Sequence, residues 1–87
     1  MNATAKPTAS VVKTFDRDNG RCIVVHVQAG HELPTWELTF YVEPGRAIEF
    51  LSAAWVDDGD GGSVECDAKS SIRRAALRAV WKFLVGE

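Results

Sequence analysis

The sequence predicts an α+β domain: a four-stranded antiparallel sheet in ββββα order, with one C-terminal amphipathic helix packed on one face. Three observations predict it. Residues 10–56 are rich in β-branched and alternating apolar residues, turn signals divide them into strand-length runs, and residues 68–85 change to a helical period. One helix on one sheet is the two-layer arrangement that this order favours.

The first two strands are expected at residues 10–15 and 21–28, joined through residues 16–20. Asn19-Gly20 is a strong hairpin signal, because both residues tolerate positive φ. The second run is rich in β-branched residues, which suit a pleated, half-buried surface. The sequence therefore opens with a β-hairpin.

The third strand, residues 35–42, shows the clearest alternation. Pro44 and Gly45 then occupy the central turn positions, where a fixed φ and a positive φ are wanted, so residues 47–56 should return as the fourth strand. One face of the third strand carries only apolar side chains: Trp36, Leu38, Phe40 and Val42.

A helix is expected from about Ala68 to Val85, with Asp67 as its cap and Gly86 as its stop. Its apolar residues gather on one broad arc of a helical wheel, opposite a basic stripe. The arc holds Ile72, Ala75, Ala76, Ala79, Val80, Phe83 and Leu84; the stripe holds Arg74, Arg78 and Lys82, with Trp81 beside it.

Length and composition indicate one soluble domain. An 87-residue chain suits a single hydrophobic core, and 46% apolar with 25% charged residues excludes the signature of disorder. Residues 1–9 are small and polar and predict a flexible N-terminal tail, which leaves residues 10–87 as the domain. No apolar run suits a membrane span or an export signal, so a cytoplasmic location with Cys22 and Cys66 as free thiols is expected.

The charge is unevenly distributed. The formal net charge of −2 gives no overall attraction to nucleic acid or to anionic lipid. Residues 43–67 hold seven acidic side chains against Arg46 alone, whereas residues 68–85 hold five basic side chains and no acid. Any electrostatic recognition is therefore expected to be local.

The acidic stretch of residues 55–67 predicts a solvated strand-to-helix connection and no metal site. A calcium loop needs oxygen ligands at positions 1, 3, 5 and 12. The best register places Asp58, Asp60 and Asp67 at three of them but a valine, Val56, at the first, and a strand enters where the motif needs a helix. Asp and Gly are also expected in an ordinary connection.

No residues predict catalysis or a cofactor. Cys22 and His26 share a strand face, but at about 3.3 Å per residue their Cα atoms lie roughly 13 Å apart, too far for a nucleophile and its base. A zinc site would also need His31 and Cys66, without the close spacing typical of such sites. Phosphate loops and nucleophile elbows are absent, so a non-enzymatic protein is expected.

A single helix covers one sheet face, and the sequence predicts large apolar groups on the other. In the tight-turn register, Leu51, Ala53 and Trp55 join the core, and Tyr41, Ile48, Phe50 and Val56 face away. With a one-residue bulge, Ile48, Phe50 and Val56 join the core instead, and Leu51 and Trp55 face away. An exposed apolar patch marks a partner or dimer interface, although curling of the sheet, or folding of the N-terminal segment over this face, would also cover it. The residues expected at a protein-binding surface are Tyr41, Ile48, Phe50, Trp55, Asp57, Asp58 and Asp60.

Two functions follow as hypotheses. The first is a small acidic regulatory domain that binds a protein partner or forms a homodimer; an inhibitor encoded by a phage or mobile element, blocking a nucleic-acid-handling host protein, would fit its size and charge. The alternative is a nucleic-acid-binding module that uses cations and an aromatic ring on the helix. Its residues would be Arg74, Arg78, Trp81 and Lys82.

Overall fold

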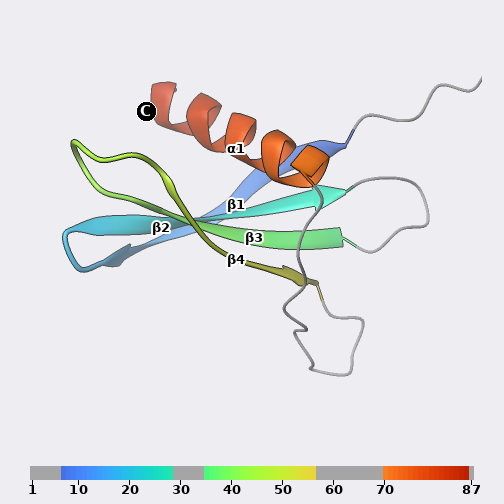
Figure 1. Ribbon diagram of the computed structural model, residues 1–87, viewed down its shortest axis with the longest axis horizontal. Coiled ribbons are helices and arrows are strands. Elements are labelled where there is room, and N and C mark those ends of the chain that lie inside the picture. Colours follow the sequence, from blue (N-terminus) through green and yellow to red (C-terminus); the bar gives the residue numbers. More distant parts are fainter. Residues whose placement is uncertain (1–6, 29–34, 57–69, 87) are drawn as a thin grey trace, which may run out of the picture.

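The computed structural model describes residues 7–28, 35–56 and 70–86. These residues form a four-stranded antiparallel sheet followed by one helix packed against it, which confirms the predicted class and order (Figure 1). The elements are β1 (Thr8–Arg17), β2 (Gly20–Gln28), β3 (Thr35–Val42), β4 (Glu49–Trp55) and α1 (Ser70–Val85). The proposed cap Asp67 lies outside the described residues.

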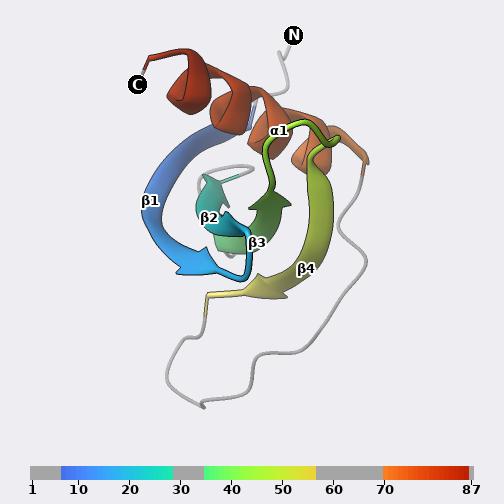
Figure 2. The ribbon, with the colours of Figure 1, turned by 90° about the vertical axis from the view of Figure 1, so that its left-hand side faces the viewer.

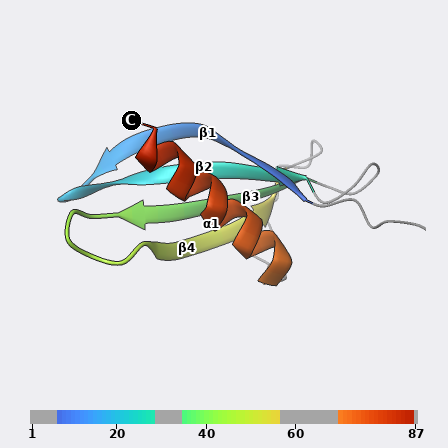
Figure 3. The same cartoon turned by 90° about the horizontal axis from the view of Figure 1, so that it is seen from above.

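The strands lie side by side in chain order, so β1 and β4 form the two edges of the sheet. The strand β1 begins at Thr8, earlier than the predicted Ser10, and Thr8 and Ala9 pair with Gln28 and Val27. Helix α1 crosses the sheet diagonally: its N-terminal half lies beside β4 and its C-terminal end lies over β1 (Figure 3). This crossing leaves the two ends of α1 next to different edges.

The first hairpin is confirmed, but its turn lies one residue earlier than expected. Arg17 pairs with Gly20, so Asp18 and Asn19 occupy the central positions, and Asp18 adopts the positive φ of 52°. Gly20 serves a different purpose, because a Cβ there would collide with the carbonyl oxygen of Val42 on β3. A glycine permits this close approach of two strands.

The second turn is confirmed as predicted. Gly45 has a φ of 80°, and the amide of Arg46 donates a hydrogen bond of 3.1 Å to the carbonyl oxygen of Glu43. The Pro44-Gly45 pair therefore provides the fixed φ and the positive φ that a type II turn requires.

A β-bulge in β4 settles the register between β3 and β4. Phe40 pairs with Phe50 and Thr39 pairs with Ser52, which leaves Leu51 as the extra residue. Beyond the bulge, Trp36 pairs with Trp55. Both large aromatic residues of β4 therefore share the face on which α1 packs.

The core lies between α1 and that face. The helical arc predicted from the sequence is confirmed, because its central members Ile72, Ala76 and Val80 are buried and the others pack against them. The sheet contributes the remaining buried members of the cluster: Ile23, Val25, Val27, Leu38, Phe40 and Ala53.

Of the two registers considered, the tight-turn register, which places Ile48 and Phe50 on the opposite face, is wrong for these two residues, and the bulged register is confirmed for them. Both side chains pack against the core cluster on the helix side, because the bulge turns them there. The opposite face still carries Cys22 and Val24, but they are only 1% and 2% exposed.

Curling of the sheet accounts for this burial. The edge strands β1 and β4 arch on either side of β2 and β3 (Figure 2). In register, Cys22 lies between Phe15 and Tyr41, on β1 and β3 respectively. Phe15 remains 46% exposed at the outer strand. Among the described residues, no helix is long and apolar enough to cross a membrane.

Candidate functional site

An apolar groove of about 310 Å³ lies between the N-terminal half of α1 and strand β4. It exists because α1 crosses the sheet obliquely and packs mainly on β1 and β2. The beginning of β4 therefore keeps an apolar surface that the helix only flanks. The groove is lined by Phe40, Ile48, Phe50, Arg73, Arg74 and Leu77.

The sheet side of the groove is aromatic. Phe40 and Phe50 are partners across β3 and β4, with ring centroids 5.7 Å apart and planes inclined by 60°. Tilted pairs at this separation are a favourable aromatic arrangement. Phe40 is buried whereas Ile48 and Phe50 are half-buried, so part of the apolar surface faces solvent.

The helix side of the groove is cationic. The guanidinium carbon of Arg73 lies 4.6 Å from the centroid of the Phe50 ring. Arg74 is exposed and lines the same groove, and Leu77 adds an apolar contact one turn further along α1. An apolar floor beside the exposed guanidinium of Arg74 suits a ligand that is both apolar and anionic.

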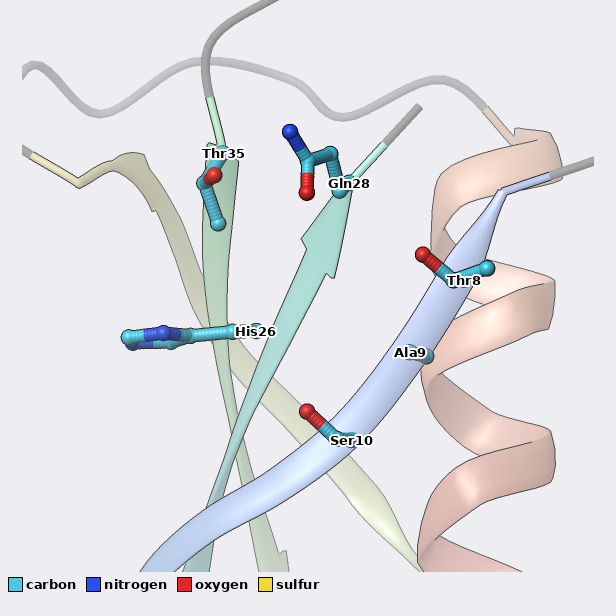
Figure 4. A pocket seen from close by; sticks show the side chains of 6 residues that line it. All are labelled: Thr8, Ala9, Ser10, His26, Gln28 and Thr35. Carbon is cyan, nitrogen blue, oxygen red and sulfur yellow. The ribbon is translucent and has the colours of Figure 1, made fainter. Parts of the chain in front are cut away.

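A polar pocket of about 300 Å³ lies on the opposite face, where β1, β2 and β3 meet (Figure 4). Among the described residues that line it, His26 alone is ionisable, and its Nε2 donates a 2.9 Å hydrogen bond to Oε2 of Glu37. Ser10 is the cross-strand partner of His26, but Figure 4 shows the His26 ring directed away from it. Ser10 and His26 therefore do not form a nucleophile and base pair. The lining residues are Thr8, Ala9, Ser10, His26, Gln28 and Thr35.

A smaller hollow of about 170 Å³ lies between α1 and the start of β1. Arg78 and Lys82 line it together with Pro7 and small alanine side chains. Trp81, on the same helix, is 55% exposed. The predicted basic stripe is therefore divided: Arg74 lines the groove, whereas Arg78 and Lys82 line this hollow.

The residues predicted for protein binding do not form one surface. Ile48 and Phe50 line the groove, whereas Tyr41 lies on the opposite sheet face in register with Cys22. Trp55 packs edge-on against Trp36, with ring centroids 5.7 Å apart, and remains 42% exposed. The predicted residues Asp57, Asp58 and Asp60 lie outside the described residues.

Three groove residues were missed as site residues in the sequence: Phe40, Arg73 and Leu77. Phe40 was placed in the core from strand alternation, and the structure confirms its burial. Arg73 and Leu77 flank the apolar arc of the helix at i, i+4 spacing. That spacing places them on one side of the helix, but nothing in it indicates that β4 lies opposite.

Tyr41 has a perturbed hydroxyl group. Partial burial raises the pKa of its phenol above the ordinary value of 10.0, and the hydrogen bond that the hydroxyl donates to Oε1 of Glu43, at 3.0 Å, raises it further. The phenol therefore stays neutral and donating at physiological pH.

The described residues contain no group of three or more potential metal ligands. Cys22 is a buried free thiol. His31 and Cys66, the further ligands considered for a zinc site, lie outside the described residues, as does the acidic stretch considered for calcium.

No protein-family model, no curated protein and no solved structure matches the chain.

Proposed function

We propose that the chain is a small non-enzymatic protein-binding domain that regulates a partner by accepting one of its segments in the groove between α1 and β4. The observation that carries the proposal is the groove itself, an apolar floor left half-exposed beside a cationic helix wall. A groove on the surface of a sheet and helix pair is a common place for a peptide to dock.

The energies available are sufficient for recognition. Full burial of one leucine or phenylalanine side chain contributes about 1.5–3 kcal/mol, and a few such anchors carry most of the binding free energy of a protein interface. The groove offers space for one such apolar side chain, with Ile48, Phe50 and Leu77 around it. Binding of moderate affinity is therefore expected, with further contacts at the rim.

The narrower hypothesis of an acidic inhibitor has a separate basis. It depends on composition and on the carboxylates of residues 57–67, which lie outside the described residues. The groove supports protein binding without specifying an inhibitor, and its cationic wall favours an acidic partner segment rather than a basic one.

Selection from a random peptide library displayed on phage tests the proposal. The wild-type protein should enrich a set of related peptides, and Leu77→Gln should weaken their binding because it places an amide in the apolar wall. Val85→Gln is the matched control, since Val85 is 80% exposed on the same helix and does not line the groove.

Each variant needs a thermal unfolding curve, because Leu77 also packs against the core. If Leu77→Gln fails to fold, Ile48→Gln replaces it as the groove variant. Failure to enrich any peptide, or equal binding by wild type and both groove variants, would refute protein binding in the groove.

A second candidate function is nucleic-acid binding on the outer surface of α1. The observation that favours it is the exposed Trp81 ring on the helix that carries Arg78 and Lys82 beside the small hollow. Cations contact phosphates and an exposed ring stacks on an unpaired base. This candidate uses a different part of the helix from the groove, so the two functions are separable by mutation.

A further inference from the structure

We propose that the groove selects a partner segment in which a large apolar side chain is flanked by carboxylates. This proposal rests on the protein-binding function proposed above and specifies the chemistry of the partner at the same site. The apolar side chain would occupy the space between Phe50, Ile48 and Leu77, and a neighbouring carboxylate would meet the guanidinium of Arg74.

Arg73 differs from Arg74 in what it offers a partner. Its guanidinium lies over the Phe50 ring, with the central carbon 4.6 Å from the ring centroid, and Arg73 makes a further interaction besides this one. Arg73 thus covers part of the aromatic floor, and the charge available to a partner is that of Arg74. Arg74, exposed on the same wall, supplies the positive charge that a carboxylate would meet.

Two acidic residues of the described chain adjoin the groove in sequence, and neither is paired with Arg74. Glu49 precedes Phe50 in β4, but it pairs with Tyr41, so strand alternation directs it to the opposite face. Glu43, in the adjoining turn, already forms an ion pair with Arg46, with Oε2 3.1 Å from Nε. None of the described residues that line the groove is acidic.

The edges of the sheet favour side-chain docking over the addition of a strand. Strand β4 carries the bulge at Leu51, and β1 carries a register shift between Val11 and Lys13. Bulges at edge strands interrupt the row of backbone groups that an added strand would need. A partner is therefore recognised mainly through side chains that enter the groove between α1 and β4 from the solvent.

Two synthetic peptides of the same length test the proposal by fluorescence anisotropy. Both carry a central Phe-Leu pair; glutamates flank it in one and lysines in the other. The wild-type protein should bind the glutamate peptide at least about tenfold more tightly, since like-charge juxtaposition at an interface costs several kcal/mol.

Charge reversal at one wall residue should reverse this preference. Arg74→Glu should weaken binding of the glutamate peptide at least about fivefold and strengthen binding of the lysine peptide. Arg17→Glu is the matched control, because it makes the same change in net charge at an exposed site on β1, the other edge of the sheet. It should leave the preference between the peptides unchanged.

The outcomes separate this proposal from the proposed function. If both peptides bind equally to the wild-type protein and Leu77→Gln binds neither, the proposed protein-binding function stands. The selection for carboxylates is then overturned. Binding of neither peptide would also overturn it, while the library selection decides independently whether the groove binds peptides. Displacement of the glutamate peptide by a single-stranded DNA oligomer that binds through Arg74 would assign the cationic wall to nucleic acid instead, and would overturn the proposal too.

Discussion

The guanidinium of Arg73 lies over the ring of Phe50, with its central carbon 4.6 Å from the ring centroid, and this contact joins α1 to the edge strand β4. The helix packs otherwise mainly on β1 and β2. The Arg73–Phe50 pair is therefore a direct contact between the two sides of the groove.

Arg73→Ala is expected to lower the free energy of unfolding by about 0.5–1 kcal/mol, the range for a cation over a ring at an exposed site. Urea unfolding measures the change. Because Arg73 makes other interactions, a double-mutant cycle with Phe50→Leu isolates the contribution of this pair. Arg74→Ala is the control and should have a smaller effect. A coupling energy of zero would show that the contact does not stabilise the fold.

Phe50→Ser should cost more stability than Trp55→Ser. Phe50 packs against the core and Phe40, so its truncation should cost roughly 2–4 kcal/mol, whereas Trp55 is 42% exposed and should cost about half as much. Thermal unfolding with light scattering compares the two. The opposite order would contradict the bulged register. Loss of a dimer signal in Trp55→Ser alone would identify a homodimer contact at that ring.

The pKa of Tyr41 should lie above the ordinary value of 10.0 in the folded protein. Since the unfolded pKa is lower, the contribution of Tyr41 to stability is complete below about pH 10 and is lost as the pH rises through the folded pKa. Ultraviolet difference absorbance measures the titration without ambiguity, because the chain has a single tyrosine.

Glu43→Gln should lower the pKa of Tyr41, since it removes the negative charge that opposes ionisation. Glu49→Gln is a suitable control, because Glu49 pairs with Tyr41 across the strands without hydrogen bonding to its hydroxyl in the described structure. An equal shift in both variants would contradict the assigned role of the hydrogen bond.

The wild-type protein is expected to show no salt-dependent nucleic-acid binding near physiological ionic strength, because its net charge is −2. Electrophoretic shifts with duplex RNA and DNA at several salt concentrations test this. If binding occurs, replacing Arg74 and Arg78 with Glu should abolish it without unfolding the protein. A clear shift at low micromolar protein that this double variant loses would establish the alternative function.

Gly20→Ala should destabilise the protein by about 1–3 kcal/mol, because the added Cβ collides with the backbone carbonyl of Val42. This carbonyl belongs to the backbone of β3, so it cannot move aside as a flexible side chain could. Gly45→Ala is the comparison: its Cβ meets open space, but its φ of 80° is strained for alanine, so a loss of roughly 1 kcal/mol is expected. Chemical unfolding of both variants gives the order. A neutral Gly20→Ala would contradict the close approach of β2 and β3.

Local signals were sufficient to predict the elements. The alternation of residues 35–42 located β3, and the Pro44-Gly45 pair located its turn, because side-chain period and backbone φ are decided by neighbouring residues. The Asn19-Gly20 signal located a hairpin but misplaced its turn by one residue. Gly20 is required by the carbonyl of Val42, which is distant in sequence, and no local pattern could indicate this.

The groove could not be predicted in the same way. Each of the two registers considered for β3 and β4 is correct for part of β4: Ala53 lies in the core as in the tight-turn register, and Phe50 packs there as in the bulged one. Alternation is preserved on either side of Leu51, so the sequence does not locate the bulge. The diagonal crossing of α1, which opens the groove, depends on how whole surfaces pack and leaves no signature in either element alone.

The most direct measurement is an NMR titration of the isotopically labelled protein with the glutamate-flanked Phe-Leu peptide. Binding in the groove predicts that the largest chemical-shift changes fall on Ile48, Phe50 and Leu77 and on the Arg74 side chain, with little change at His26. Changes centred on the polar pocket around Ser10 and His26, or on Trp81 and Lys82, would contradict a protein-binding groove between α1 and β4.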